Sequence, residues 1–243
     1  MNFRIIYNSF KADFRFISRD PMLLLASVAP VILIILMRFL FPLLVEYIYT
    51  KSSFNLNDYY PVVTITMVSL IPMLFGMVYA FILLDENDTH ILQVISVTPS
   101  GKRNFLYMRM LVPALLSLVM VLITIFIIDP VEGEGWLRNI YISVLLASQA
   151  PFTFLLIGCL AGNKVEGLAL SKLYGVFLVA VPLGLILHHP WNYIMFYSPL
   201  YWISWAWIIP SPSESLAYGA IALFITGGSI ILLFRYFLNK RCE

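Results

Sequence analysis

Of the 243 residues, 61% are hydrophobic and only 12% are charged, with a formal net charge of +2. A typical soluble domain is about 45–50% apolar and about 25% charged, so this chain carries too few charges to solvate a globular surface. Several apolar blocks reach the length of about 20 residues that a helix needs to cross a bilayer. Composition therefore excludes an ordinary soluble domain and predicts an all-α polytopic membrane protein.

The first 20 residues predict an amphipathic interfacial helix rather than a span. Their apolar side chains recur every three or four residues, at Phe3, Ile6, Phe10, Phe14 and Ile17. We expect no cleavable signal peptide, because this segment lacks a short apolar core followed by a small-residue cleavage site. Asp20-Pro21 should end this helix and start the next, since proline suits a first helical turn.

Longer apolar blocks then predict six membrane-spanning helices, which form one transmembrane domain over residues 21–243. Their approximate bounds are 22–44, 61–84, 110–128, 140–161, 173–187 and 216–237. Before the last helix, an aromatic-rich stretch from His188 to Pro210 is interrupted by Pro190 and Pro199. Because tryptophan and tyrosine prefer the membrane–water boundary, we expect a re-entrant outer segment of short helices there.

Lysine and arginine are distributed very unequally between the two sides of this topology. One side has only Lys51 and Arg138, and Arg38 lies inside the first span. The other side holds Arg4, Lys11, Arg15, Arg19, Lys102, Arg103, Arg109, Lys164, Lys172, Arg235, Lys240 and Arg241. Since basic residues are enriched on the cytoplasmic side, we expect a multi-pass cell-membrane protein with both termini in the cytoplasm.

The polar segment from Asp85 to Arg103 carries the most information about function. Its acidic start, Asp85 to Asp88, suits the N-terminal turn of a helix, and Pro99 disfavours further helix. Apolar side chains between them would share one face or lie beside it: Ile91, Leu92, Val94 and Ile95. The segment thus predicts a short capped helix whose apolar stripe packs either on the protein's own spans and lipid headgroups or in a groove of a soluble partner.

Nearly the whole chain resembles the type-2 ATP-binding-cassette exporter permeases, including those labelled as drug or fluoroquinolone exporters. The resemblance includes an acidic pair before a threonine-containing helix that ends in Val97-Thr98-Pro99. It also includes the amphipathic helix running into Arg19-Asp20-Pro21, the run from Asn163 to Lys172, and the aromatic re-entrant stretch.

This resemblance implies a permease subunit that pairs with a second permease, the same chain or a related one, in membrane lipid. Each permease would dock a cytoplasmic ATPase through Glu86, Thr89, Ile91, Leu92, Val94, Ile95 and Val97. A second cytoplasmic contact would use Asn163, Lys164, Glu166 and Lys172. ATP and magnesium would bind the ATPase, because this chain lacks a G-x-x-x-x-G-K-[ST] loop. We therefore expect a transport subunit with no cofactor of its own, no enzyme activity and no nucleic-acid partner.

The substrate is expected to be amphipathic or hydrophobic: a drug, an antimicrobial peptide or a lipid-like molecule. Tyr79, Phe81, Tyr174 and Phe177 could line its path, or could make ordinary helix–helix and lipid contacts. An ion- or proton-coupled carrier, or a membrane enzyme or assembly factor, is the alternative. The spans offer almost no ionisable side chains for either alternative.

Three further features have simpler interpretations than a functional site. Arg38 either snorkels to headgroups, pairs with Glu46, or marks a transport path. His188 and His189 are adjacent and lack nearby acidic or cysteine ligands, so a metal site is disfavoured. Cys159 and Cys242 lie too far apart in sequence to suggest a disulfide framework.

Overall fold

A computed structural model describes residues 13–52, 55–89, 101–128, 135–187 and 190–240. Throughout these ranges the chain is helical or in short turns. Residues 13–19 form a helical segment that ends at Asp20. The elements after it are α2 (Pro21–Ile35), η1 (Leu36–Leu40), α3 (Phe41–Ser52), η2 (Leu56–Tyr59), α4 (Tyr60–Asp88), α6 (Gly101–Ile128), α7 (Gly135–Ala147), α8 (Gln149–Leu160), α9 (Lys164–Ile186), η3 (Trp191–Tyr197), α10 (Pro199–Ile208) and α11 (Pro212–Lys240).

Within the described residues, six helical stretches are long and apolar enough to cross a membrane. They are Pro21–Lys51, Leu56–Asp88, Arg103–Ile128, Gly135–Leu160, Lys164–Ile186 and Pro212–Asn239. The predicted all-α polytopic fold is therefore confirmed. Two of the stretches join several elements: the first runs through α2, η1 and α3, and the fourth joins α7 to α8 across Ser148.

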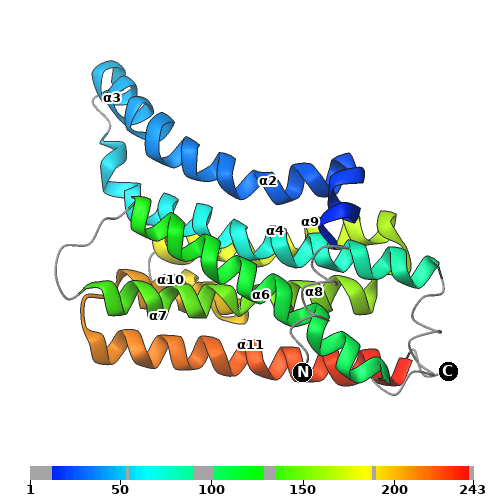
Figure 1. The fold of residues 1–243 in the computed structure, drawn as a ribbon. Helices are drawn as coiled ribbons and strands as arrows, with labels where there is room; N and C mark the ends of the chain where they lie inside the picture. The colour runs from blue at the N-terminus through cyan, green and yellow to red at the C-terminus, as the bar shows by residue number, and fades with distance from the viewer. Residues whose placement is uncertain (1–12, 53–54, 90–100, 129–134, 188–189, 241–243) are drawn as a thin grey trace.

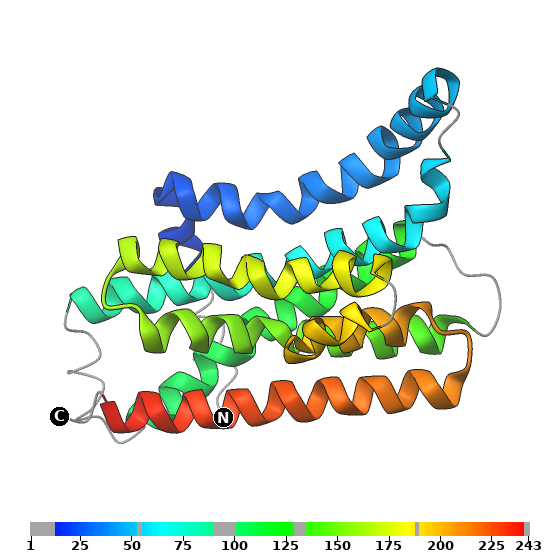
Figure 2. The ribbon, with the colours of Figure 1, turned by 180° about the vertical axis from the view of Figure 1, so that it is seen from behind.

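The spans run back and forth along one bundle, with α4 near its centre. Helix α4 packs against α2, α6, α8 and α9, whereas α11 lies on the outside against α8 and α10 (Figure 1). The stretch α2–η1–α3 contacts α4 near its start and leans away from the bundle toward α3, as the reverse view also shows (Figure 2). Much of its surface is consequently exposed, including Leu25 and Phe39.

Two hydrophobic clusters fill the bundle, one toward each end. The first gathers α4, α6, α7, α9 and α10 around Ile71, Ile125, Leu145 and Tyr174. The second joins α2, the last turns of α4, α8 and α11 around Leu23, Phe81, Phe154 and Phe234. The first cluster packs one end of α4 against α6, α7, α9 and α10, and the second packs its last turns against α2, α8 and α11.

Helix α4 approaches α8 closely at Gly76. A Cβ placed on Gly76 would lie 2.5 Å from the carbonyl oxygen of Ala150 and 2.7 Å from Cβ of Thr153. Since contacts this short are too close for real Cβ atoms, only glycine allows the two helices to pack at this distance. This contact lets the central helix sit against α8 over much of its length.

The aromatic stretch before the last span forms two short helices, as predicted. The 3-10 helix η3 is followed by α10, which begins at Pro199 and is too short, at 10 residues, for the about 20 that a crossing requires. Tyr197 and Ser198 donate hydrogen bonds to the carbonyl oxygens of Val176 and Phe177 in α9, at 2.8 and 2.9 Å. These bonds tie the stretch to the neighbouring span.

Most of the spanning helices extend beyond their apolar blocks; helix α6, for example, begins at Gly101 and not near residue 110. The first spanning helix continues to Ser52 instead of ending near residue 44, because no proline or glycine follows Pro42 in α3. Helix α9 begins at Lys164, well before residue 173, because Asn163 caps it. Arg38 therefore lies deep inside the first helical stretch, in the π-helical turn η1, and is exposed. No ion pair links it to Glu46 in the described part of the chain.

Candidate functional site

Charged side chains from distant parts of the chain meet at one end of the bundle. We call this the charged end, and its ion-pair network consists of Asp13, Asp20, Asp85, Glu86, Arg109 and Lys164. All ion pairs between described residues belong to this network. Figure 1 shows why they meet: the N-terminal helical turn, the end of α4 and the starts of α6 and α9 lie at the same end.

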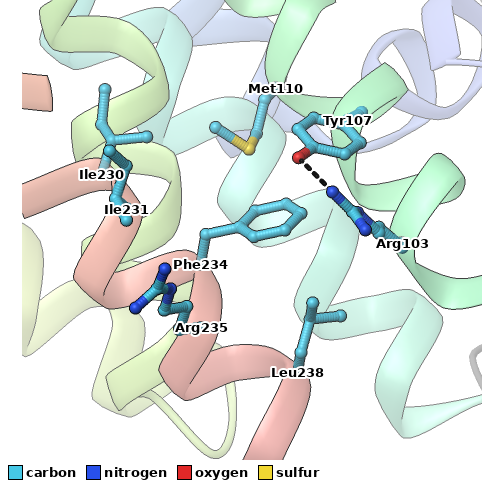
Figure 3. A pocket seen from close by; sticks show the side chains of 8 residues that line it. All are labelled: Arg103, Tyr107, Met110, Ile230, Ile231, Phe234, Arg235 and Leu238. Carbon is cyan, nitrogen blue, oxygen red and sulfur yellow. Dashed lines mark hydrogen bonds between the residues drawn. The ribbon is translucent and has the colours of Figure 1, made fainter.

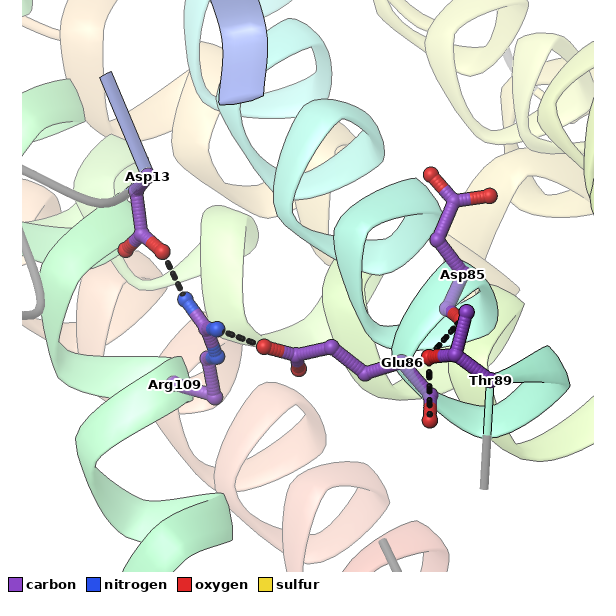
Figure 4. Close-up of polar contacts among 5 residues, drawn as sticks. All are labelled: Asp13, Asp85, Glu86, Thr89 and Arg109. Carbon is purple, nitrogen blue, oxygen red and sulfur yellow. Dashed lines mark hydrogen bonds and ion pairs between the residues drawn. The ribbon is translucent and has the colours of Figure 1, made fainter. Parts of the chain in front are cut away.

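Arg109 is the centre of the more buried half of the network. Its guanidinium group, projecting from α6, is paired with Asp13 of the N-terminal segment and with Glu86 of α4 (Figure 4). The three side chains are 12%, 5% and 15% exposed, in the order Arg109, Asp13, Glu86. A buried charge is costly unless it is paired, so this arrangement holds three elements together.

Lys164 is the centre of the other half. Its Nζ atom lies 2.9 Å from a carboxylate oxygen of Asp20 and 2.7 Å from one of Asp85. Asp20 also caps α2, accepting hydrogen bonds from the backbone N–H groups of Met22 and Leu23. Lys164 thus connects the start of α2, the end of α4 and the start of α9.

The two N-terminal carboxylates respond oppositely to their surroundings. Burial raises the pKa of Asp13, although the nearby Arg109 charge and hydrogen bond partly oppose that shift. The hydrogen bond from Lys164 lowers the pKa of Asp20, and the Met22 and Leu23 N–H groups act in the same direction, against a smaller effect of burial. Asp20 is therefore held firmly as an anion, whereas Asp13 depends on Arg109 to stay ionised.

The structure corrects the predicted role of the acidic run from Asp85 to Asp88. These residues form the last turn of α4, and the segment in which the predicted short helix would follow lies outside the described residues. Carboxylates are disfavoured at a helix C-terminus by the helix dipole, and Arg109 and Lys164 supply the compensating positive charge. Thr89 ends α4, its hydroxyl donating to the carbonyl oxygens of Asp85 and Glu86 at 2.8 and 3.3 Å (Figure 4).

Only part of the predicted docking set lies in the described residues. Glu86 points toward Arg109, and Thr89 is exposed at the end of α4. Ile91, Leu92, Val94, Ile95 and Val97 fall outside the described residues, so their role stays a prediction. His188 and His189, at which a metal site was disfavoured, also lie outside them.

The predicted second contact, from Asn163 to Lys172, forms the N-cap and the first turns of α9. Asn163 accepts a hydrogen bond from the N–H of Glu166 at 2.9 Å, and the Glu166 carboxylate accepts from the N–H of Gly162 at 2.6 Å. This is a capping arrangement of the kind that starts helices. Lys164 faces the network, whereas Lys172 is exposed farther along α9. A role in binding an ATPase stays a prediction for all four residues.

The four candidates for a substrate path are packed inside the single chain. Tyr79, Phe81 and Tyr174 are at most 1% exposed. Phe177 is partly buried, and its ring lies 5.6 Å from those of Tyr174 and Tyr197. In this arrangement they contribute to the core, and a role in lining a path stays a prediction.

Sequence reasoning missed Asp13, Asp20 and Arg109 as members of a site. One signal was available for Asp13: it lies three residues after Phe10 and four before Ile17, on the apolar face of the amphipathic helix. A carboxylate on a face that is to be buried requires a cation, but the sequence did not indicate which one. Among the described residues no cluster of histidine, cysteine or acidic side chains could hold a metal ion.

These features define the class of the protein, a multi-pass helical membrane protein with its ion pairs gathered at one end. The chain belongs to the family described as Fluoroquinolones export permease protein Rv2686c-like, whose model matches residues 13–235. It is therefore a permease, a transport subunit and not an enzyme, and the resemblance to drug-export permeases is confirmed.

Two curated relatives from Mycobacterium tuberculosis extend this comparison. They are the Fluoroquinolones export permease proteins MT2760, from strain CDC 1551 / Oshkosh, and Rv2686c, from strain ATCC 25618 / H37Rv. Each is 28% identical to this chain over 242 residues, which covers 94% of this chain and 92% of the relative. No solved structure matches the chain.

Proposed function

We propose that this chain is the membrane subunit of an ATP-driven exporter, in which a separate cytoplasmic ATPase binds ATP and magnesium. Two permeases, the same chain or related ones, would form the pathway. The charged end would face the cytoplasm, together with both termini, in agreement with the excess of lysine and arginine there. The family supports this proposal, since its relatives are named export permeases.

The ion-pair network is the observation that carries the proposal. It fixes the last turn of α4 to the N-terminal segment, α6 and α9 directly before the segment that would dock the ATPase. A force applied to the residues after Thr89 would therefore reach several spans together, because all of them share Arg109 or Lys164. This is how a partner that hydrolyses ATP outside the membrane could move the bundle.

The substrate follows from the relatives and from the composition of the spans. Since both relatives are named for fluoroquinolones, we propose export of an amphipathic or hydrophobic drug of that kind. The apolar and aromatic interior suits such a molecule better than a strongly hydrated ion. ATP would supply the energy for this work, in keeping with the few ionisable side chains that the described spans offer to a coupling proton.

Isolation of the tagged chain from its host in mild detergent tests the docking proposal. The wild-type chain should co-purify with an ATPase that carries a G-x-x-x-x-G-K-[ST] motif. Ile91→Asp combined with Ile95→Asp should abolish co-purification, since it places charge on the predicted apolar stripe. The matched control is Ile194→Asp, an exposed isoleucine in η3, outside the predicted docking segment, which should retain the ATPase.

A second variant separates docking from transmission. Asp20→Asn removes one of the two carboxylates that Lys164 holds, at a position outside both predicted ATPase contacts. The ATPase should therefore bind normally while drug export falls severalfold. Retention of the ATPase by the double aspartate variant would refute the docking surface. Full export by Asp20→Asn would refute the role of the network.

A further inference from the structure

A groove with arginine on its walls and an apolar floor lies between α6 and α11 near the charged end. It has a volume of about 390 Å³ and is lined by Arg103, Tyr107, Met110, Ile230, Ile231, Phe234, Arg235 and Leu238 (Figure 3). The residues of the ion-pair network are not part of its lining. The groove is thus separate from the site described above.

The two arginines are available to bind an anion. Both are exposed, and within the described chain neither forms an ion pair with a carboxylate. Arg103 is positioned by Tyr107: it donates a hydrogen bond to the tyrosine hydroxyl at 3.4 Å, and its guanidinium lies 5.6 Å from the ring centre. In the view of Figure 3 the guanidinium groups of Arg103 and Arg235 lie on either side of Phe234.

The floor of the groove is apolar and well ordered by ring packing. Tyr107 and Phe234 stack with their ring centres 4.6 Å apart, which joins α6 to α11. Met110 and Ile230 continue the apolar surface farther into the two spans, and Ile231 is 56% exposed beside them. The basic groups, Arg103 and Arg235, therefore lie toward the ends of the two helices, and the apolar side chains lie farther along the groove.

This sorting matches the depth profile of a bilayer. Arg103 is the first residue of its candidate span, Arg103–Ile128, and Arg235 lies near the end of Pro212–Asn239. In a bilayer crossed by these two spans, both guanidinium groups would lie at the level of the lipid headgroups, and Met110 and Ile230 would lie at the level of the acyl chains. Arginine binds phosphate oxygens through two parallel hydrogen bonds, so the charges complement an anionic headgroup.

We propose that this groove binds one phospholipid with an anionic headgroup, such as phosphatidylglycerol, from the leaflet that faces the charged end. The phosphodiester lies between Arg103 and Arg235, and an acyl chain lies along Met110, Ile230 and the Tyr107–Phe234 pair. The lipid thereby bridges α6 and α11 on the outer surface of the bundle. The inference rests on the two spans and does not depend on the proposed ATPase or drug.

Native mass spectrometry of the full chain tests this assignment. The protein is equilibrated in mild detergent with equimolar phosphatidylglycerol and phosphatidylcholine that carry the same acyl chains. The wild type should retain one phosphatidylglycerol in preference to phosphatidylcholine. Arg103→Gln with Arg235→Gln should reduce that retention by about tenfold, since each basic residue near a membrane surface contributes appreciably to binding acidic lipid.

A matched control removes the same charge from the same end of the bundle. Arg15→Gln with Arg19→Gln changes two exposed arginines outside the groove and should leave lipid retention unchanged. Equal loss in both double variants would show a general effect of net charge and overturn the site. Equal retention of the two lipids by the wild type would also overturn it, and that result requires no variant.

Two other occupants give distinct outcomes in the same experiment. Displacement of phosphatidylglycerol by millimolar inorganic phosphate would show a plain anion site and refute the lipid. A change from dimer to monomer mass in Arg103→Gln with Arg235→Gln, with lipid retention unaltered, would show that a second copy covers the groove. Either result contradicts the proposal without bearing on the ATPase.

Discussion

At the scale of single residues, the charged end depends on two cations that each serve two carboxylates. Arg109 and its partners are largely shielded from water, whereas Lys164 is 32% exposed. Loss of an ion pair should therefore cost more stability in the half of the network around Arg109 than in the half around Lys164. Removing a cation leaves uncompensated buried charge in the first half and a weaker, partly solvated defect in the second.

Arg109→Gln is expected to destabilise the protein substantially. Loss of one partner of a buried ion pair costs about 3–5 kcal/mol. Because Asp13 and Glu86 keep a small exposed fraction, we expect a loss of stability at the lower end, about 3 kcal/mol. The melting temperature, measured by size exclusion after heating, checks this expectation. Adding Asp13→Asn and Glu86→Gln to Arg109→Gln should recover most of the loss. No recovery would show that charge is not the cause.

Asp20 predicts a dependence of stability on acidic pH. Because its pKa is lowered from 3.8 in the folded protein, it contributes stability that is present above that value and is lost as the pH falls through the folded pKa. The wild type should melt at a higher temperature than Asp20→Asn at neutral pH. The difference should begin to narrow below about pH 4 and close only below the folded pKa. A difference that stays constant with pH would show that the Asp20 charge contributes nothing.

At the scale of the helices, close packing at Gly76 determines how α4 meets α8. The side chain that a larger residue would bring there meets a backbone carbonyl oxygen, which cannot move aside as a flexible side chain can. Gly175 in α9 is different, since a Cβ there would have no neighbour within 4 Å. Two glycines in apolar spans thus have unequal structural roles.

Gly76→Ala should destabilise the bundle by about 1–3 kcal/mol, the usual cost of overpacking a well-filled interior. Gly175→Ala is the matched control and should be neutral or stabilising by up to about 1 kcal/mol, because alanine favours the helix over glycine. Melting temperatures of the two variants, compared in one detergent, check the contrast. Equal effects would mean that the α4–α8 contact is looser than this structure shows.

At the scale of the whole molecule, the start of α2 and the end of α11 lie at the charged end, whereas the end of α3 and the start of α11 lie at the other (Figure 1). Four exposed residues belong to these helix ends in the sequence: Arg19 and Asn239 for the charged end, Lys51 and Glu214 for the other. The proposed orientation therefore predicts which positions react with a membrane-impermeant maleimide on intact cells. In a chain carrying Cys159→Ala and Cys242→Ser, Lys51→Cys and Glu214→Cys should react. Arg19→Cys and Asn239→Cys should react only after permeabilisation. The reverse pattern would place both termini outside.

The sequence by itself determined the all-α fold, the number of spans and the short helices before the last one. These follow from local quantities, since long apolar blocks, prolines and aromatic residues act on the segment that contains them. Local reasoning failed at helix ends. The acidic run from Asp85 to Asp88 was predicted to start a helix but forms the last turn of α4, because the charges that permit carboxylates there come from α6 and α9.

Only the tertiary structure decided which charges pair, which glycine is indispensable for close packing, and where two arginines flank an apolar groove. Asp13 and Arg109 are far apart in sequence, as are Arg103 and Arg235, so no local pattern relates them. Their proximity follows from packing of the apolar spans, which brings the ends of separate helices together. Once apolar packing has fixed that geometry, the need to pair shielded charges selects Arg109 and Lys164 as the shared partners.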